Sequence, residues 1–198
     1  QGFKIVPAAS GVAELAALSD VGHLSLVQAF SSLAERVDIL IIDTAPGITP
    51  GVLQLSQAAQ HVVVTVCDEP ASLTDAYALI KVLSRYHGVT RLRVLANRVR
   101  VPGDGQVLFR KLQKVTDRFL DLALEYVGEI PEDERQRSAI HAQRPLIELF
   151  PSSPASRAFD KLANAIAKWP LPQGVRGNLE FFVERLVRRP AVPFEVVT

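Results

Sequence analysis

An aspartate stands at the end of an apolar run, and a short loop follows it. Asp43 closes the run DILIID at residues 38–43, and the next four residues are Thr44, Ala45, Pro46 and Gly47. A carboxylate at the mouth of a buried strand is costly unless something there requires it. It can hold Mg²⁺ through a water molecule, beside a loop able to approach a terminal phosphate. The alternative is an aspartate that caps a loop or binds a ribose hydroxyl.

Two more groups of polar residues follow apolar runs. Asn97 and Arg98 come after RLRVLA, and the amide can present both a donor and an acceptor to a purine edge. The alternative for Asn97 is a turn between a strand and a loop. Pro131 and Glu132 lie in the segment GEIPEDE. The backbone of that segment either lines a base or begins a helix with acidic residues in its first turn.

Other reactive side chains favour structural roles. Asp68 and Glu69 precede SLTD at residues 72–75, which predicts a capping box, so both acids indicate helix entry. A place at a protein interface is the alternative for these two acids. The single cysteine, Cys67, is expected to be a small buried strand residue. The histidines lack the spacing of metal ligands and are expected in surface or loop positions: His23, His61, His87 and His141.

Apolar, β-rich runs alternate with helix-period segments along the chain. Strands are predicted at residues 3–8, 38–43, 61–67, 91–97 and 124–130. Helices are predicted at 23–36, from Pro50 with Thr49 as N-cap, from Ser72 to Gly88, at 104–122, from Ser153 to near Trp169, and at 178–189. Strands that are apolar on both faces and separated by helices indicate an α/β fold, with a mostly parallel sheet sandwiched by helices. Ligands bind such sheets outside the carboxyl ends of the strands, where the polar groups above stand.

Composition restricts the class of protein. The 198 residues are 48% hydrophobic, which is enough for one substantial core. Lysine and arginine number 22 against 21 acids, so no direct binding of nucleic acid is expected. One cysteine excludes an internal disulfide framework and suits a reducing cytosol. No apolar run approaches the roughly 18 residues that span a bilayer.

The last predicted helix is amphipathic. Its apolar stripe consists of Leu179, Phe182, Val183 and Leu186. Its positive charges, near the C-terminal end, are Arg185, Arg188 and Arg189. This pattern suits a helix lying in the headgroup region of an anionic membrane. The alternative is a last helix docked on its own domain, with arginines that favour the helix dipole.

The order of these segments resembles a known family. DILIIDTAPGI, VVVTVCDEPASLTDAYALIKVL, VLANR and GEIPEDE follow one another as in the MinD/ParA-type ATPases, and within them the flagellar-number regulators of the FlhG/FleN type. KVTDRFLDLALEYVG and RGNLEFFVERLV also look like FleN proteins, so the resemblance covers nearly the whole chain. It implies a P-loop NTPase fold.

The resemblance also implies roles for single residues. Asp43 matches the Walker B aspartate that holds Mg²⁺ through water, and Thr44 to Gly47 match switch II. Asn97 matches the asparagine that reads adenine, with Arg98 beside it, and Pro131 and Glu132 match the loop that wraps the base. Glu69 and Asp75 fall on the segment that faces the partner subunit in ATP-bound dimers.

The implied protein is an ATP hydrolase that binds ATP or ADP with Mg²⁺ and forms homodimers. It is expected in the cytoplasm, reversibly associated with the inner face of the membrane at a cell pole, where it controls flagellar number or placement. Its expected partners are an FlhF-type GTPase and a FleQ-type transcription regulator.

One departure from the family pattern is large. The phosphate-binding pattern G-x-x-x-x-G-K-[ST] and a switch I aspartate are not found in the sequence. The chain is therefore expected to be the later part of a longer protein and not to hydrolyse ATP alone. Residues 1–170 are interpreted as a partial P-loop ATPase domain, and residues 171–198 as a Pro-rich joint and the amphipathic helix. The alternative function is a non-catalytic interaction module on the same fold, which binds a GTPase or a transcription factor through residues 68–85.

Overall fold

The computed structural model describes residues 3–6 and 37–170. The chain forms two compact units, one made of Gln1–Ala59 with Gln173–Thr198 and the other of Gln60–Pro172. The predicted helices at residues 23–36 and 178–189 lie outside the described residues, together with part of the predicted strand at residues 3–8.

In the first unit, one predicted helix is confirmed and two predicted strands are not. Helix α3, Pro50–Ala58, begins after Thr49 as N-cap with Pro50 in its first turn. Residues 38–43 form no strand, and the exposed fractions of Ile39 and Ile41 are 54% and 81%. Residues 3–6 are likewise not a strand. A strand exists through hydrogen bonds to a neighbour, and apolar content alone supplies none, so both predictions are wrong for the described residues.

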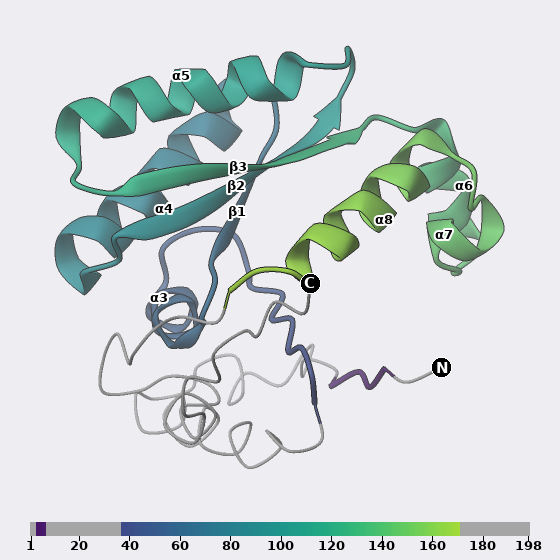
Figure 1. Ribbon diagram of the computed structural model, residues 1–198, viewed down its shortest axis with the longest axis horizontal. Helices are drawn as coiled ribbons and strands as arrows, with labels where there is room; N and C mark the ends of the chain where they lie inside the picture. The colour runs from purple at the N-terminus through teal and green to yellow at the C-terminus, as the bar shows by residue number, and fades with distance from the viewer. Residues whose placement is uncertain (1–2, 7–36, 171–198) are drawn as a thin grey trace, which may run out of the picture. The chain divides into compact units, whose positions relative to one another are not determined.

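The second unit contains a parallel sheet of three strands in sequential order (Figure 1). They are β1, Val63–Val66, β2, Arg91–Val99, and β3, Ala123–Pro131. Helix α4, Pro70–His87, connects β1 to β2, and helix α5, Asp104–Phe119, connects β2 to β3. Three helices follow: α6, Glu134–His141, α7, Leu146–Leu149, and α8, Pro154–Ile166. The predicted parallel α/β architecture is confirmed.

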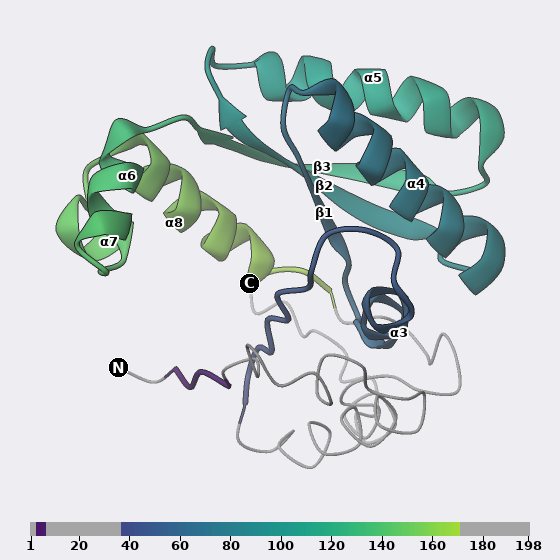
Figure 2. The same ribbon diagram turned by 180° about the vertical axis from the view of Figure 1, so that it is seen from behind.

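The two faces of the sheet are covered by different helices. Helices α4 and α5 lie on one face, and α8 lies on the opposite side next to β3 (Figures 1 and 2). Side chains alternate along β2: Leu92, Val94 and Ala96 are fully buried, and Ala96 faces α5. Leu95 lies on the opposite face and packs against a second core, which consists of Ile130, Ala139, Leu146 and Ala155. Helices on both faces explain why β2 places apolar side chains on each of them, whereas β1 alternates exposed and buried residues.

Helix α4 begins earlier than predicted and ends where predicted. The helix begins at Pro70, after Glu69 as N-cap, and Glu69 makes no side-chain cap. Ser72 instead accepts a hydrogen bond from the N–H of Cys67 at 2.9 Å. The predicted capping box is therefore wrong, because proline is preorganised for the first helical position and the N-cap is Glu69, three residues before Ser72. Gly88 ends the helix as predicted, with a left-handed φ of 66°.

Asp133 joins the starts of α6 and α8. Its Oδ1 accepts from the N–H of Arg135 at 3.0 Å, and its Oδ2 accepts from the N–H of Ala155 at 3.2 Å. Burial by itself raises the pKa of this carboxyl. The two N–H groups, a hydrogen bond from Ser153 and the charge of Arg135 together outweigh that effect, and the pKa is lowered. Ser153 caps α8 as predicted, by accepting from the N–H of Ser156.

No helix in the described ranges has the length and apolar character required to cross a bilayer.

Candidate functional site

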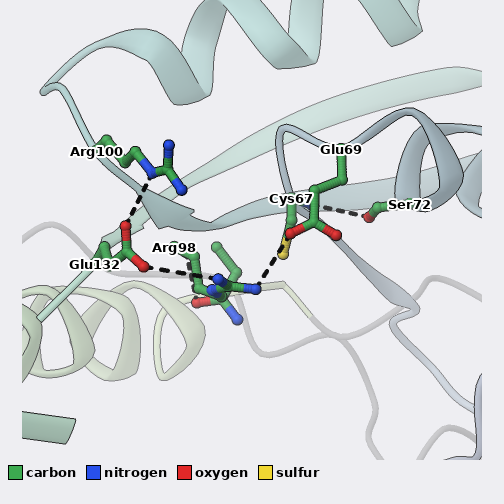
Figure 3. A network of polar contacts seen from close by, with 7 residues as sticks. Cys67, Glu69, Ser72, Arg98, Arg100 and Glu132 are labelled. Carbon is green, nitrogen blue, oxygen red and sulfur yellow. Dashed lines mark hydrogen bonds and ion pairs between the residues drawn. The ribbon is translucent and has the colours of Figure 1, made fainter. Parts of the chain in front are cut away.

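Loops from all three strands meet at the carboxyl edge of the sheet. The guanidinium of Arg98, from β2, lies between Glu69, after β1, and Glu132, after β3 (Figure 3). The nitrogen–oxygen distances are 3.3 Å to Glu69 and 3.7 Å to Glu132. Arg100 holds the second carboxylate oxygen of Glu132 at 3.1 Å. The structure thus joins residues predicted for base binding to a residue predicted for subunit contact.

Asn97 and Arg98 stand in a bulge of β2. The register with β3 runs from Ala96 opposite Glu129 to Val99 opposite Pro131, so β2 has one extra residue between these pairs. Arg98 takes a left-handed φ of 56°, which is unfavourable for a residue with a side chain. The Oδ1 of Asn97 accepts from the N–H of Arg98 at 3.0 Å and stabilises this bend. The bulge turns Asn97 and Arg98 out of the regular pairing at the site edge.

A pocket of about 140 Å³ lies beside the bulge. Its lining includes Cys67, Glu69, Asn97, Arg98, Leu108 and Glu132. Cys67 is half-buried just beyond the end of β1, not inside the strand as predicted. Burial raises the pKa of the Cys67 thiol most strongly, the charge of Arg98 opposes the rise and that of Glu69 adds to it. The thiol is therefore a poor nucleophile at neutral pH.

Glu129 fixes the wall of this pocket formed by the start of α5. Its carboxylate accepts from the N–H groups of Gly103 at 2.9 Å and Gly105 at 3.1 Å, and from the hydroxyl of Tyr126 at 3.2 Å. The N-cap of α5 is Gly103, which has no side chain for capping, so Glu129 supplies the acceptor from a neighbouring strand. This role was not predicted.

A second bulge aims Glu129 at α5. Val94 pairs with Tyr126 but Leu95 pairs with Gly128, so Val127 is an extra residue in β3. Gly128 takes a φ of 131°, which glycine allows. Simple alternation would put Glu129 on the face opposite Tyr126, whereas the extra residue returns it to the same face. Burial, then the charge and the hydrogen bond of Glu129, raise the pKa of Tyr126 to about 12.

A different polar cluster lies on the other face of the sheet. Arg93, only 5% exposed, donates to Nδ1 of His61 at 2.7 Å and pairs with Glu125 at 3.1 Å. Its guanidinium stacks over the ring of Trp169 at 4.1 Å, and that ring meets His61 edge to face. His61 lies in the bend before β1, a loop position as expected, and is half-buried with its ring packed against Trp169. The cross-strand register that sets Arg93 opposite Glu125 is the signal that sequence inspection missed.

The other residues predicted for the site lie at the end of β3, on α4 and in the first unit. Pro131 ends β3, and the N–H of Glu132 donates to the carbonyl of Val99 at 2.9 Å. Asp75 is exposed on α4. The five residues from Asp43 to Gly47 belong to the first unit and are exposed there, with a φ of 101° at Gly47. The predicted membrane-facing residues from Leu179 to Arg189 lie outside the described residues. Residues 3–6 and 37–170 hold no group of three or more potential metal ligands.

The sequence is similar to an antiactivator and to a flagellum site-determining protein. It is 56% identical over 190 residues to the antiactivator FleN of Pseudomonas aeruginosa, covering 96% of this chain and 68% of that protein. It is 26% identical to the flagellum site-determining protein YlxH of Helicobacter pylori, covering 94% of this chain and 64% of that protein. The chain thus spans about two thirds of the length of these relatives. No protein-family model matches the sequence.

The fold is similar to that of a solved septum site-determining protein. MinD of Pyrococcus horikoshii, solved in complex with Mg-ADP, matches with a TM-score of 0.56 at 21% identity. The match covers 82% of this chain and 65% of that one. At this identity the likeness establishes the fold of the described sheet and helices.

Proposed function

Because the chain belongs to the MinD/ParA-type ATPases, in the group of the FleN antiactivators, we propose that the full-length protein is an ATP-dependent regulator of flagellar number. The names of the two relatives, an antiactivator and a flagellum site-determining protein, support the flagellar role. The geometry at the carboxyl edge of the sheet supports the adenine nucleotide as the switching ligand.

The bulge at Asn97 and Arg98 is the observation that carries the nucleotide proposal. An adenine edge requires an acceptor for its amino group and a donor for N7, and one asparagine amide supplies both. The bulge presents Asn97 outside the regular strand pairing, beside the pocket and the loop at Pro131 and Glu132. Glu132 is already held by Arg98 and Arg100, so its carboxylate orders the loop and leaves base reading to Asn97.

Other residues would bind the phosphate end of the nucleotide. Asp43 would hold Mg²⁺ through a water molecule, and the residues from Thr44 to Gly47 would form the adjoining switch loop. The exposed carboxylate of Asp43 and the glycine conformation at Gly47 fit a residue and a loop that a ligand can approach. When bound, Mg²⁺ neutralises charge that develops on the phosphates. MinD of Pyrococcus horikoshii was solved with Mg-ADP, which supports the same pair of ligands here.

Dimerisation and membrane contact complete the proposal. Glu69 and Asp75, near the start of α4, would face a second copy of the protein in its ATP-bound homodimer. The stripe from Leu179 to Leu186 would lie on an anionic membrane at its cytoplasmic face, and each nearby arginine adds about 1 kcal/mol to such binding. An FlhF-type GTPase and a FleQ-type transcription regulator are the proposed partner proteins.

A gene replacement tests this function. The full-length gene is placed in a Pseudomonas aeruginosa strain that lacks its own FleN, and flagella per cell are counted by electron microscopy. The intact gene should restore the normal number. Asp43→Asn should fail, and should slow ATP hydrolysis by the purified protein at least about tenfold, because the metal loses a charged partner. Asp38→Asn, at the exposed opposite end of the same run, is the matched control and should restore the number. Full restoration by Asp43→Asn would favour the non-catalytic interaction module.

A further inference from the structure

Arg98 connects two loops through contacts that are weak enough to rearrange. Its side chain is 56% exposed, and those of Glu69 and Glu132 are 60% and 40% exposed. Ion pairs with this exposure change an equilibrium constant by up to about fivefold. A ligand that makes stronger contacts at this edge can therefore redirect the guanidinium without disrupting the fold.

Asn97 and Arg98 share one hydrogen-bonding atom. The Oδ1 of Asn97 accepts from the N–H of Arg98 at 3.0 Å, and this bond supports the left-handed backbone at Arg98. The same oxygen is the acceptor that an adenine amino group requires. An amide oxygen has two lone pairs and can accept both bonds. When the amino group binds, the oxygen is shared, and its bond to the N–H of Arg98, which supports the unfavourable conformation, is weakened. Occupancy by the base and the direction of the Arg98 side chain are therefore linked through a single atom.

Glu69 is the residue that Arg98 holds at the start of α4. It occupies the N-cap position, yet its side chain makes no cap hydrogen bond and turns to Arg98 instead. A carboxylate at this end of a helix is stabilised by the helix dipole even without a partner. Release from Arg98 therefore leaves an exposed anion that can pair with a cation on another molecule.

We propose that Arg98 is a positioning residue that couples recognition of the adenine amino group at Asn97 to release of Glu69 for contact with a second subunit. The coupling rests on the proposed function, which puts the base at Asn97 and the second copy at the start of α4. In the free protein Arg98 holds Glu69 and Glu132 together. With adenine bound, Arg98 gives up Glu69, and the dimer gains an ion pair across its interface.

The coupling is measured with two nucleotides that differ only in the amino group. Dimerisation of the full-length protein is followed by sedimentation at saturating ATP and at saturating purine riboside triphosphate, which has the same phosphates and N7 but no 6-amino group. Wild-type protein should dimerise about three- to fivefold more tightly with ATP. Arg98→Met and Glu69→Gln should each reduce this ratio to one. A purely structural role for either residue would weaken both dimers equally and leave the ratio intact.

Arg144→Met is the matched control. It removes an arginine of similar exposure, 58%, from an ion pair of similar length, 3.5 Å, at α7. It should keep the wild-type ratio, and circular dichroism should show native folding for all variants. The coupling would be overturned if Arg98→Met kept the wild-type ratio of dimerisation with the two nucleotides. It would also be overturned if Arg144→Met reduced that ratio as much as Arg98→Met does. A ratio of one in a wild-type protein that dimerises well with both nucleotides would also overturn it, while the proposed function would stand. No dimerisation with either nucleotide would overturn both.

Discussion

Gly105 lies directly against Glu129. Its N–H donates to the carboxylate at 3.1 Å, and a Cβ built at position 105 would lie 2.5 Å from the same oxygen and 2.8 Å from the Cβ of Ala96. Real Cβ atoms do not approach so closely, so the first turn of α5 can lie this near to β2 and β3 only because residue 105 is glycine. The contact determines where the pocket wall stands relative to Asn97.

Gly105→Ala should therefore destabilise the protein by about 1–3 kcal/mol, because the backbone of α5 has to move away from β2 and β3. The free energy of unfolding is measured with urea. The exposed neighbour Gln106→Ala serves as control and should change stability by less than about 0.5 kcal/mol. Equal stability of the two variants would show that the start of α5 adapts without cost.

The raised pKa of Tyr126 leads us to expect that the folded protein loses stability in alkali. The pKa of this tyrosine is raised from 10.0 to about 12, so the folded protein holds the phenol proton more tightly than the unfolded chain does. This contribution is complete below pH 10 and is lost as the pH rises toward 12. The urea midpoint should fall across that window, and Tyr126→Phe should flatten the fall. Tyr86→Phe, at an exposed tyrosine, should keep the wild-type slope, and an unchanged slope in Tyr126→Phe would contradict the assignment.

The lowered pKa of Asp133 leads us to expect that the folded protein loses stability in acid. The pKa of this carboxyl is lowered from 3.8, so its contribution is complete above that value and is lost as the pH falls through the lowered folded-state pKa. Asp133→Ala should cost about 1–2 kcal/mol at pH 7, because the starts of α6 and α8 lose their shared acceptor. Asp160→Ala, exposed on α8, is the control. The idea fails if both variants unfold at the same urea concentration at pH 7.

The single tryptophan reports on the cluster around Arg93. Arg93→Met removes the cation that stacks on Trp169, a contact of about 0.5–2 kcal/mol, and also leaves Glu125 without its buried partner. Tryptophan emission should shift to longer wavelength, and quenching by acrylamide should increase. Arg91→Met, which removes the exposed arginine paired with the same glutamate, should leave the spectrum unchanged. An identical spectrum in Arg93→Met would mean that the stacking is absent in solution.

The architecture of the second unit could be predicted because it depends on patterns local to each segment. Helical connections between successive apolar runs require the strands to run parallel. Cover on both faces does not extend to β1 within the described residues, where exposed and buried residues alternate. Parallel strands place their carboxyl ends at one edge, so Asn97 and Glu132 were expected to be close. Their closeness to Glu69 follows from the same rule.

What could not be predicted depends on pairing between distant residues. The aim of Glu129 depends on a bulge at Val127, and no residue type in GEIPEDE indicates on which face that carboxylate lies. The burial of Arg93 depends on Glu125 standing opposite it in another strand. The strand predicted at residues 38–43 is absent for the same reason. The apolar side chains of this segment do not determine whether a neighbouring strand is available for hydrogen bonding.

Calorimetric titration of ATP and GTP into the full-length protein measures base recognition by Asn97. Wild-type protein should bind ATP more tightly than GTP. Asn97→Ala should weaken ATP binding at least about tenfold, equal to about 1.4 kcal/mol, and remove the preference, because the adenine edge loses its partner. Asn164→Ala, at an exposed asparagine on α8, should bind both nucleotides as the wild type does. An Asn97→Ala protein that keeps the wild-type preference for ATP over GTP would show that Asn97 does not read the base.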